Sequence, residues 1–247
     1  MIVQIKRYPK SSKSELWRRV QGVLLAGLMM SGSAFVVLAD GKEETERARK
    51  AAKVLSDIMK APDKGIPGDL LKQAHAIAVI PHVVKGAFGV GGRFGKGLVS
   101  RKTAAGGWGT PAFIDIGGGS VGFQIGVTAT DLILVFVDET TLKGLLGDRL
   151  KLGADASVAA GPVGRSAEAG VSGSLKAGIY SYSRSKGLFA GVALDGAVLS
   201  IDDEANAAVY GSGVTGAQVL EGKVKATRAV KPLVDALTRY APARIAK

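Results

Sequence analysis

The chain has 247 residues, which are enough for one sizeable hydrophobic core and require no second domain. It contains no cysteine, so disulfides, thiolate nucleophiles and zinc–thiolate sites are excluded. The formal net charge is +12, and most of the 35 glycines lie among apolar residues in alternating runs. This pattern is typical of bends and of close approach between strands rather than of a flexible linker.

The first residues have the pattern of a secretory signal peptide. Six Lys and Arg residues and one Glu lie among the first 19 residues, and an apolar run over 20–38 follows. A glutamine and a Ser-Gly-Ser stretch interrupt this run, so it is poor as a stable membrane span. Val37 and Ala39 predict cleavage after Ala39, and hence an exported protein, periplasmic or extracellular and peripheral on a membrane. An uncleaved anchor is the alternative, whereas a lipoprotein anchor is excluded by the lack of cysteine.

Residues 42–60 predict an amphipathic helix. Its apolar side chains form one stripe at helical spacing, and Glu43/Arg47 is one of two favourable i,i+4 pairs. Pro62 ends the helix because proline cannot continue the hydrogen-bond ladder, and a short helix over 69–73 follows. The stripe consists of Ala48, Ala51, Ala52, Leu55, Ile58 and Met59.

Short runs with period-two alternation predict a mainly β region from His75 to about Asp202. Residues 132–137 are continuously apolar and are expected to be buried on both faces, and residues 142–146 predict a helical turn. The expected fold class is α+β, with a mainly antiparallel, barrel-like or strongly curved sheet flanked by N- and C-terminal amphipathic helices. The predicted strands are 75–80, 87–90, 98–102, 112–116, 121–128, 132–137, 154–160, 177–184, 188–194 and 197–201.

A C-terminal helix is predicted from about Ala217, with one apolar stripe, a kink at Pro232 and an end at Pro242. From Ala217 onward there are seven Lys and Arg residues and two acidic residues, so this segment holds five of the net positive charges. A tail with this charge favours an anionic surface as partner. An exported protein rarely meets nucleic acid, so anionic lipid is the better candidate.

No motif predicts catalysis. Residues 117–122 match G-x-G-x-x-G, but they lead into an alternating strand rather than a helix, which indicates a tight hairpin turn. Residues 91–97 lack the first glycine and the Ser/Thr of a P-loop, and the two histidines lack metal-ligand spacing. Asp131 and Asp195 precede predicted strands and suit turn capping. We therefore expect no enzyme activity, no cofactor and no metal site.

The most distinctive block is Ser-Tyr-Ser-Arg-Ser-Lys-Gly-Leu-Phe-Ala-Gly at residues 181–191. Its hydroxyls and two cations are expected to form a polar ledge, and its small/large alternation predicts a strand with distinct faces. The block resembles the signature of the SYLF lipid-binding domain family. Further family-like motifs extend the match from about Ile66 to Gly211. There are two departures: Gly109, where serine is expected after the tryptophan, and the absence of any cysteine. These motifs lie at 77–81, 91–97, 108–113, 122–126, 130–132, 152–155, 160–165 and 210–211.

The resemblance implies non-enzymatic binding of anionic phospholipid headgroups at a membrane surface. In eukaryotic relatives it implies phosphoinositide binding and membrane remodelling, with actin association in some. An exported protein of bacterial type would meet neither phosphoinositides nor actin in a periplasm. Only headgroup binding in a general sense therefore carries over from the resemblance. In the predicted mechanism, cations draw the protein to a negative surface and an amphipathic helix then inserts its apolar stripe. Two alternatives stay open: a periplasmic structural, interaction or stress-related module, and an acyl-chain carrier.

Cations beside glycine turns are the candidate lipid-binding residues, because a cation and backbone N–H groups can together hold a phosphate. Trp108 is a candidate interfacial anchor, although a packing role is favoured. The predicted organisation is a signal peptide at 1–39, an N-terminal helix at 40–65, a SYLF-like β domain at 66–211 and a basic helical segment at 212–247. The candidates are Arg93, Lys96, Arg101, Arg165, Arg184, Lys186, Lys223, Lys225, Arg228 and Lys231.

Overall fold

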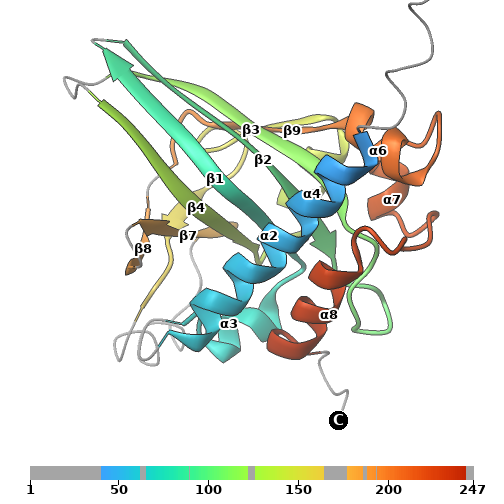
Figure 1. Cartoon of the computed structure of the whole chain (residues 1–247). Helices are drawn as coiled ribbons and strands as arrows, with labels where there is room; N and C mark the ends of the chain where they lie inside the picture. The colour runs from blue at the N-terminus through green and yellow to red at the C-terminus, as the bar shows by residue number, and fades with distance from the viewer. Residues whose placement is uncertain are drawn as a thin grey trace, which may run out of the picture. The chain divides into compact units, whose positions relative to one another are not determined.

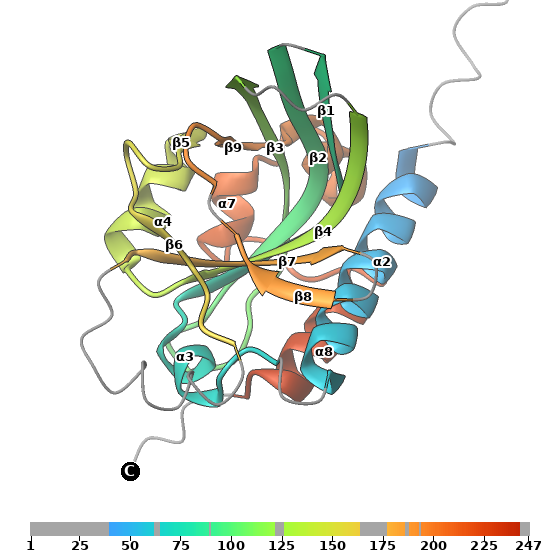
Figure 2. The same ribbon diagram turned by 90° about the vertical axis from the view of Figure 1, so that its left-hand side faces the viewer.

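A strongly curved, mainly antiparallel sheet organises the computed structural model of the chain (Figures 1 and 2). The strand order is β5-β9-β3-β2-β1-β4-β7-β6, with β8 paired to β7, and the β6–β7 pair is parallel. Together with the helices described below, this confirms the expected α+β fold class. The structure describes residues 40–61, 65–88, 90–121, 126–163, 177–185, 188–192 and 194–242.

Four long strands, β1 to β4, form the centre of the sheet and are joined by antiparallel pairing. Several of the predicted short strands are therefore parts of longer ones. The strands are β1 (Ala76–Phe88), β2 (Val90–Arg101), β3 (Ala112–Val121), β4 (Gly126–Phe136), β5 (Arg149–Lys151), β6 (Val158–Ala160), β7 (Ile179–Ser185), β8 (Leu188–Gly191) and β9 (Val198–Ile201).

A β-bulge in β1 lets one strand run through two regions that the sequence predicts as separate. The register against β4 shifts between Ile80 and Val83. Within the bulge His82 has a φ of 57°, which is uncommon for a residue other than glycine. Its backbone N–H donates to Oδ1 of Asp131 at 3.0 Å. Asp131 thus lies inside β4 and caps the bulge, and the prediction that it precedes a strand is wrong.

The glycine run of β3 belongs to the sheet rather than to a turn. Gly117 is paired with Phe94 and Gly119 with Gly92 of β2, so these residues stay in the antiparallel ladder. The predicted hairpin turn is therefore wrong for residues 117–119. Residues 122–125 lie outside the described part of the chain, so the predicted strand over 121–128 is described only at its two ends.

Helices cover both faces of the sheet. The N-terminal helix α2 and the C-terminal helix α8 lie together on one face, and α4 and α7 lie on the other side (Figures 1 and 2). Among the described residues, no helix combines the length and apolar composition needed to cross a bilayer. The helices are α2 (Asp40–Lys60), α3 (Gly68–Gln73), α4 (Glu139–Leu146), α6 (Asp203–Tyr210), α7 (Gly216–Leu220) and α8 (Lys231–Tyr240).

A hydrophobic cluster lies on each face of the sheet. In the first cluster, Leu55 of α2 and Leu237 of α8 pack with Leu98 of β2, and all three side chains are fully buried. The second cluster contains Leu134 of β4 and Leu142 of α4. Residues 132–136 are all exposed by 2% or less, so the expected burial on both faces is confirmed for them, whereas Val137 at the end of the predicted stretch is only half-buried.

The C-terminal segment forms two helices instead of one kinked helix. Helix α7 ends at Leu220, and Gly222 has a φ of 80°, a conformation that favours glycine. Pro232 lies in the first turn of α8, where its missing N–H has no intrahelical partner to lose. The predicted kink is therefore wrong. Lys223, Lys225 and Arg228 lie between the helices rather than on a helix face.

Candidate functional site

Five of the eight predicted lipid-binding cations that the structure describes have a carboxylate partner. Arg93, Lys225 and Arg228 form no ion pair among the described residues, whereas Arg165 and Lys186 lie outside them. The ion pairs are Lys96–Asp202 at 3.3 Å, Arg101–Glu139 at 2.9 Å, Lys223–Glu221 at 2.6 Å, Lys231–Asp235 at 2.6 Å, and Arg184 with Asp57.

Arg184 of the signature block connects β7 to α2. Its guanidinium pairs with Asp57 of α2 and lies 4.0 Å from the carboxylate of Asp131 in β4. Lys53 also pairs with Asp57, at 2.7 Å. Burial alone would raise the pKa of Asp57, but Lys53 and Arg184 outweigh it and hold that pKa below its usual value. These contacts give Arg184 a role in attaching α2, which sequence analysis does not predict.

The hydroxyl groups of Ser181 and Tyr182 in the signature block lie in the interior and not on the predicted polar ledge, whose Lys186 is outside the described residues. Ser181 and Tyr182 are fully buried in β7, which lies between β4 and β8, and Tyr180 is 9% exposed. Ser181 Oγ donates to the carbonyl of Ala159 at 3.1 Å, and Tyr182 Oη donates to that of Pro162 at 3.2 Å. These two side chains therefore stabilise the interior, because the buried hydroxyls of Ser181 and Tyr182 both have a backbone acceptor.

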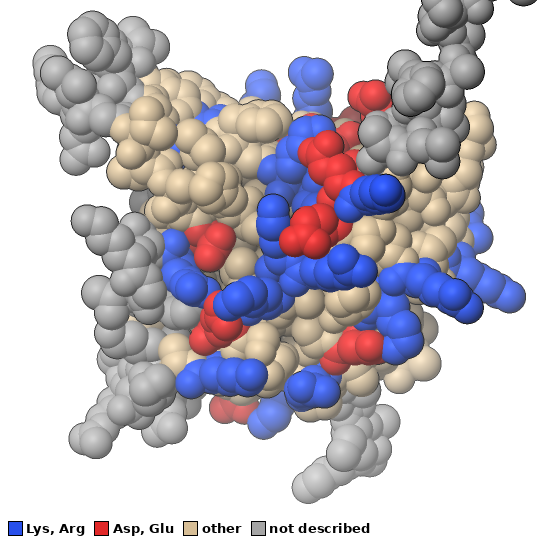
Figure 3. Space-filling view, in the orientation of Figure 1, with Lys and Arg blue, Asp and Glu red and all other residues tan. Residues whose placement is uncertain are grey.

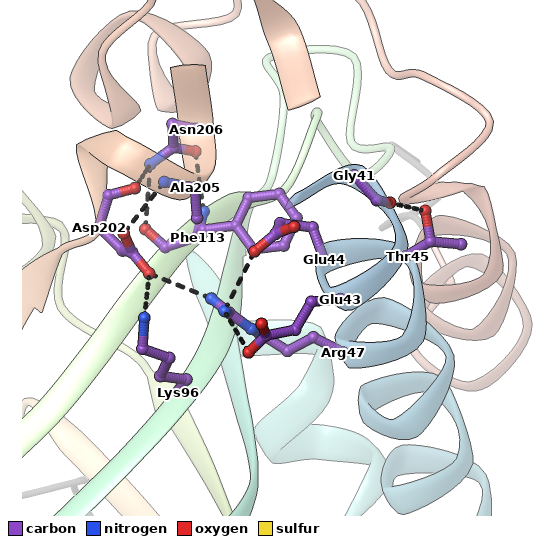
Figure 4. Close-up of polar contacts among 10 residues, drawn as sticks. All are labelled: Gly41, Glu43, Glu44, Thr45, Arg47, Lys96, Phe113, Asp202, Ala205 and Asn206. Atoms are coloured by element: carbon purple, nitrogen blue, oxygen red, sulfur yellow. Dashed lines mark hydrogen bonds and ion pairs between the residues drawn. The ribbon is translucent and has the colours of Figure 1, made fainter. Parts of the chain in front are cut away.

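A buried ionic cluster joins the first half of α2 to the chain that follows β9 (Figure 4). Arg47 is 7% exposed and lies 3.1 Å from Asp202 and 3.3 Å from Glu44. Lys96 of β2 reaches the same Asp202 carboxylate. Burial alone would raise the pKa of Asp202, but the Ala205 N–H, Lys96 and Arg47 hold it below its usual value.

Asn206 holds α6 against β3 and so places Asp202 in this cluster. Its Nδ2 donates to the carbonyl of Phe113 at 3.1 Å, and its Oδ1 accepts from the Phe113 N–H at 2.9 Å (Figure 4). The paired part of β9 ends at Ile201 opposite Ile114. The amide side chain thus continues the backbone hydrogen bonding of β3 beyond the last strand residue.

Asp115 lies beside the same cluster. It is opposite Lys96 in the β2–β3 register, and its buried Oδ1 accepts no hydrogen bond from the described residues. Burial raises the pKa of Asp115, and the negative charge of Asp202 raises it further, while Lys96 and Arg47 oppose this effect. The carboxylate therefore makes the stability of this region dependent on pH.

Trp108 belongs to the core. Its side chain is 9% exposed, and Nε1 donates to the carbonyl of Ala241 at 2.6 Å. The ammonium group of Lys102 lies 5.4 Å from the centre of the ring. The favoured packing role is confirmed, and the indole is not available as an interfacial anchor in this structure.

A cavity of about 600 Å³ lies at the α3 end of the sheet and contains one of the predicted cations, Arg101. The cations around it already have partners, because Arg101 pairs with Glu139 and Lys102 donates to the carbonyls of Leu71 and Lys72. The region therefore has little free positive charge for an anionic ligand.

A groove of about 400 Å³ separates α2 from β1 and β2. Its strand side is largely apolar, and Phe94 is 56% and Val84 36% exposed there. Its helix side is charged, and Figure 3 shows a band of Lys, Arg, Asp and Glu side chains along α2 beside a largely uncharged surface. The groove is lined by Glu43, Glu46, Arg47, Lys50, Pro81, His82, Val84, Phe94, Gly95 and Lys96.

Strands β1 to β4 continue past this groove, away from α3 and α8 (Figures 1 and 2). We call this part the free end of the sheet and define it as residues 84–86, 92–94, 117–119 and 127–129. Its only charged residues are Lys85 and Arg93, which are directly opposite each other in β1 and β2. Neither forms an ion pair within the described structure.

The free end has one apolar face. Val84 is paired with Phe94, and Gly86 with Val127, so the strand alternation places Val84, Phe94 and Val127 on one side of the sheet. Val127 is 77% exposed. Lys85 and Arg93 lie on the opposite side. Two cations without carboxylate partners and three exposed apolar side chains thus lie at one end of the molecule.

Comparison with known proteins identifies the family. Residues 117–240 match the family described as "Ysc84: Las17-binding protein actin regulator". The chain belongs to the Ysc84 family. This match confirms the resemblance carried by the signature block at 181–191, and it runs from the middle of β3 to the end of α8.

Curated relatives of this Ysc84-family chain come from yeast and vertebrates. "LAS seventeen-binding protein 3" of Saccharomyces cerevisiae is 36% identical over 204 residues, which are 79% of this chain and 44% of the relative. "SH3 domain-containing YSC84-like protein 1" of Xenopus laevis is 34% identical over 200 residues, 78% of this chain and 59% of the relative. The chain thus spans about half the length of these relatives, whose names describe binding proteins rather than enzymes.

Sequence analysis of this Ysc84-family member identifies Arg93 but misses the other residues of the free end: Val84, Lys85, Phe94 and Val127. The available signal is the lack of charge over 86–92, at the β1–β2 hairpin, and over 116–130, where the chain passes from β3 to β4, next to Lys85 and Arg93. This signal becomes interpretable only with the strand register, which brings the two stretches to one end of the sheet.

Proposed function

We propose that this protein binds anionic phospholipid at a membrane surface and catalyses no reaction. The observation that carries the proposal is the Lys85–Arg93 pair at the free end of the sheet. Like charges directly opposite each other on neighbouring strands destabilise a sheet. A phosphate group close to both cations would remove this repulsion and form charge-assisted hydrogen bonds.

Two further features support an anionic surface as partner. The formal net charge of the chain from Asp40 onward, without the predicted signal peptide, is +7, which favours association with negatively charged surfaces. Lys225 and Arg228 between α7 and α8 are exposed and lack ion pairs among the described residues, so they offer a second cationic region. The family match is compatible with lipid binding, and the relatives' names add protein partners.

The arrangement of the helices changes the expected mechanism. The predicted apolar stripe of α2 packs into the core, where Ala48, Ala51, Leu55 and Ile58 are fully buried. Leu233 and Leu237 of α8 are fully buried in the same cluster. Inserting either stripe into a bilayer would require the helix to leave the sheet and expose this core. We therefore assign the initial contact to exposed cations of the folded protein and not to helix insertion.

Flotation with vesicles of phosphatidylglycerol and phosphatidylcholine tests the proposal. The double variant Lys85→Gln/Arg93→Gln should bind such vesicles more weakly, by about fivefold for each cation removed. The matched control is Lys72→Gln/Lys143→Gln, which removes two exposed charges elsewhere on the described surface and should have less effect. Equal binding of wild type to anionic and pure phosphatidylcholine vesicles, or to neither, would overturn the proposal.

The C-terminal cations form the second arm of this experiment. Replacing Lys223, Lys225, Arg228 and Lys231 by Gln should also weaken binding to anionic vesicles. Lys223 and Lys231 already pair with carboxylates, so we expect Lys225 and Arg228 to account for most of the change. An unchanged affinity would restrict the binding surface to the free end of the sheet.

Export to a periplasm or to the cell exterior is part of the proposal. It is based on the basic start, the apolar run over 20–38 and the small residues before Asp40. N-terminal sequencing of the exported protein should begin at Asp40, and a start at Met1 would favour an anchored form.

An interaction module is the second candidate, because two relatives are named for binding Las17 or resembling Ysc84 and because α2 and α8 pack on the sheet as that alternative expects. Absence of vesicle binding would favour this account. An acyl-chain carrier has less support, since buried side chains of the second hydrophobic cluster pack together between the sheet and α4 and α7. Mass spectrometry of extracted ligands tests it.

A further inference from the structure

We infer that the free end of the sheet is the part of the protein that enters the membrane, with Phe94 and Val127 at the boundary between headgroups and acyl chains. This inference rests on the proposed function and adds the surface and the orientation of contact. Its occupant is an anionic bilayer, and it assigns membrane entry to strand residues rather than to the helices.

Side-chain burial changes abruptly along one face of the sheet. Leu98 of β2 and Ile77 and Val79 of β1 lie on the face covered by α2 and α8, and all three are fully buried. Phe94 lies on the same face four residues before Leu98, yet it is 56% exposed. The apolar face thus continues into the open groove beside α2, at Val84 and Phe94, and past this groove at Val127. These three are the large hydrophobic side chains found exposed in the described structure.

The charge of the free end favours an anionic bilayer over a second copy of the chain. The free end contains no carboxylate, and its two charged residues are both cations. In a symmetric dimer the same patch lies on both sides of the interface, so this end would bring Lys85 and Arg93 of two copies together. An anionic bilayer instead supplies negative charge around an apolar interior, which matches both parts of this surface.

The order of residues along the strands matches the layers of a bilayer. Val127 and Gly86 form one cross-strand level, Lys85 and Arg93 the next, and Val84 and Phe94 the one after it. Successive levels are separated by about 3.3 Å. With Val127 among the upper acyl chains, the long side chains of Lys85 and Arg93 can extend to the phosphates. Phe94 then lies at the depth of the headgroups and the first methylene groups.

A tryptophan reporter tests the orientation. The variant Phe94→Trp should show a blue-shifted emission with phosphatidylglycerol-containing vesicles and quenching by lipids brominated on the acyl chain. Ala105→Trp, an exposed position in the loop after β2 and hence at the other end of that strand, is the matched control and should show little quenching. Spectra of wild type provide the background of the two native tryptophans. Quenching of the Ala105→Trp protein but not of the Phe94→Trp protein would overturn the inference.

Substitution by serine gives a second readout. Phe94→Ser and Val127→Ser should each weaken binding to the anionic vesicles by about tenfold, since each removes apolar area from the membrane contact. Both side chains are exposed, so the melting temperatures should stay close to that of wild type. Loss of vesicle binding without loss of folding would support the inference.

The outcomes separate the inference from the proposed function. If wild type does not float with anionic vesicles, the proposed function fails. If wild type floats and both serine variants bind as well as wild type, the proposed function stands and the inference is overturned. If sedimentation shows a dimer that dissociates in Phe94→Ser, the free end is an interface between copies, which also overturns the inference.

Discussion

Arg47 illustrates how a single side chain attaches α2 to distant parts of the chain. Its position in the sequence predicts a surface pair with Glu43, yet that contact is 3.8 Å long and Glu43 is 75% exposed. The closer partners are Glu44 and Asp202, both 7% exposed at their side chains. The guanidinium also lies 5.4 Å from the centre of the Phe113 ring, so its environment is that of a buried, fully engaged cation.

Replacing Arg47 by Ala should destabilise the protein by about 3 kcal/mol, because two buried carboxylates lose a partner. Urea denaturation measures the change. The control is Arg49→Ala, which removes an exposed i,i+3 contact with Glu46 and should change the stability by less than about 0.5 kcal/mol. Equal effects of the two substitutions would show that the Arg47 cluster contributes nothing beyond a surface pair.

Asp115→Asn should alter the pH dependence of stability. Folding raises the pKa of this carboxyl above its unfolded value of about 3.9. The ionised form therefore destabilises the fold, and this loss develops as the pH rises from the unfolded pKa through the folded pKa. We expect the Asn variant to be more stable than wild type at neutral pH and to lose this advantage below about pH 4. Urea denaturation over a pH series measures the effect. A difference in the free energy of unfolding between variant and wild type that does not change with pH would contradict this prediction.

The sequence predicts which residues carry charge but not which charges remain free. Cations beside glycines were good candidates by residue type, and Arg93 does lack an ion pair among the described residues. Arg184 and Lys96 instead pair with Asp57 and Asp202, which are 127 and 106 positions away. Such partners depend on strand order and on helix packing, and no local spacing reveals them.

At the scale of elements, Gly191 of β8 occupies a position that has no room for a side chain. A Cβ there would lie 2.7 Å from Cβ of Ala160 and 2.8 Å from the backbone N and O of Gly161. Gly191→Ala should therefore destabilise by about 1–3 kcal/mol, and Gly191→Val by more. Thermal or urea denaturation measures this.

Gly117→Ala is the matched control for Gly191, because a Cβ at Gly117 in β3 would have nothing within 4 Å. Its stability should change by less than about 0.5 kcal/mol. An unchanged melting temperature for Gly191→Ala would mean that β8 does not approach residues 160–161 as closely as the structure places it.

The existence of most strands follows from alternation, but their lengths and ends do not. Alternation is interrupted at the bulge around His82 and in the glycine run of β3, and both interruptions lie inside continuous ladders. Helix α6 has only alanine, valine and tyrosine as apolar residues, so it shows no strong stripe. Its start depends on Asp202, whose carboxylate accepts from the Ala205 N–H. The apolar stripe predicted from Ala217 onward continues past Gly222 in the sequence. Helix α7 nevertheless ends at Leu220, and Gly222 has a positive φ that does not continue a helix.

At the scale of the whole molecule, the positive net charge predicts salt-sensitive membrane association. Raising the ionic strength from about 0.01 to about 0.15 M shortens the Debye length from roughly 30 to roughly 8 Å. Binding to phosphatidylglycerol-containing vesicles should weaken over this range, and binding to phosphatidylcholine vesicles should stay low throughout. Flotation at a series of salt concentrations measures this. Salt-independent binding would mean that apolar contacts alone hold the protein on the membrane.

The partners of α2 come from very late in the chain. Arg47 pairs with Asp202, 155 positions on, and the hydroxyls of Ser56 and Tyr240 are hydrogen-bonded across 184 positions. During synthesis α2 therefore emerges long before the residues that cover its apolar stripe. We expect slow, late docking of α2, as for other proteins of high contact order. A nascent chain in which α2 has not yet packed against the sheet would remain available to chaperones. If the protein is exported, such a chain would also remain available to a translocation channel that accepts only unfolded chains.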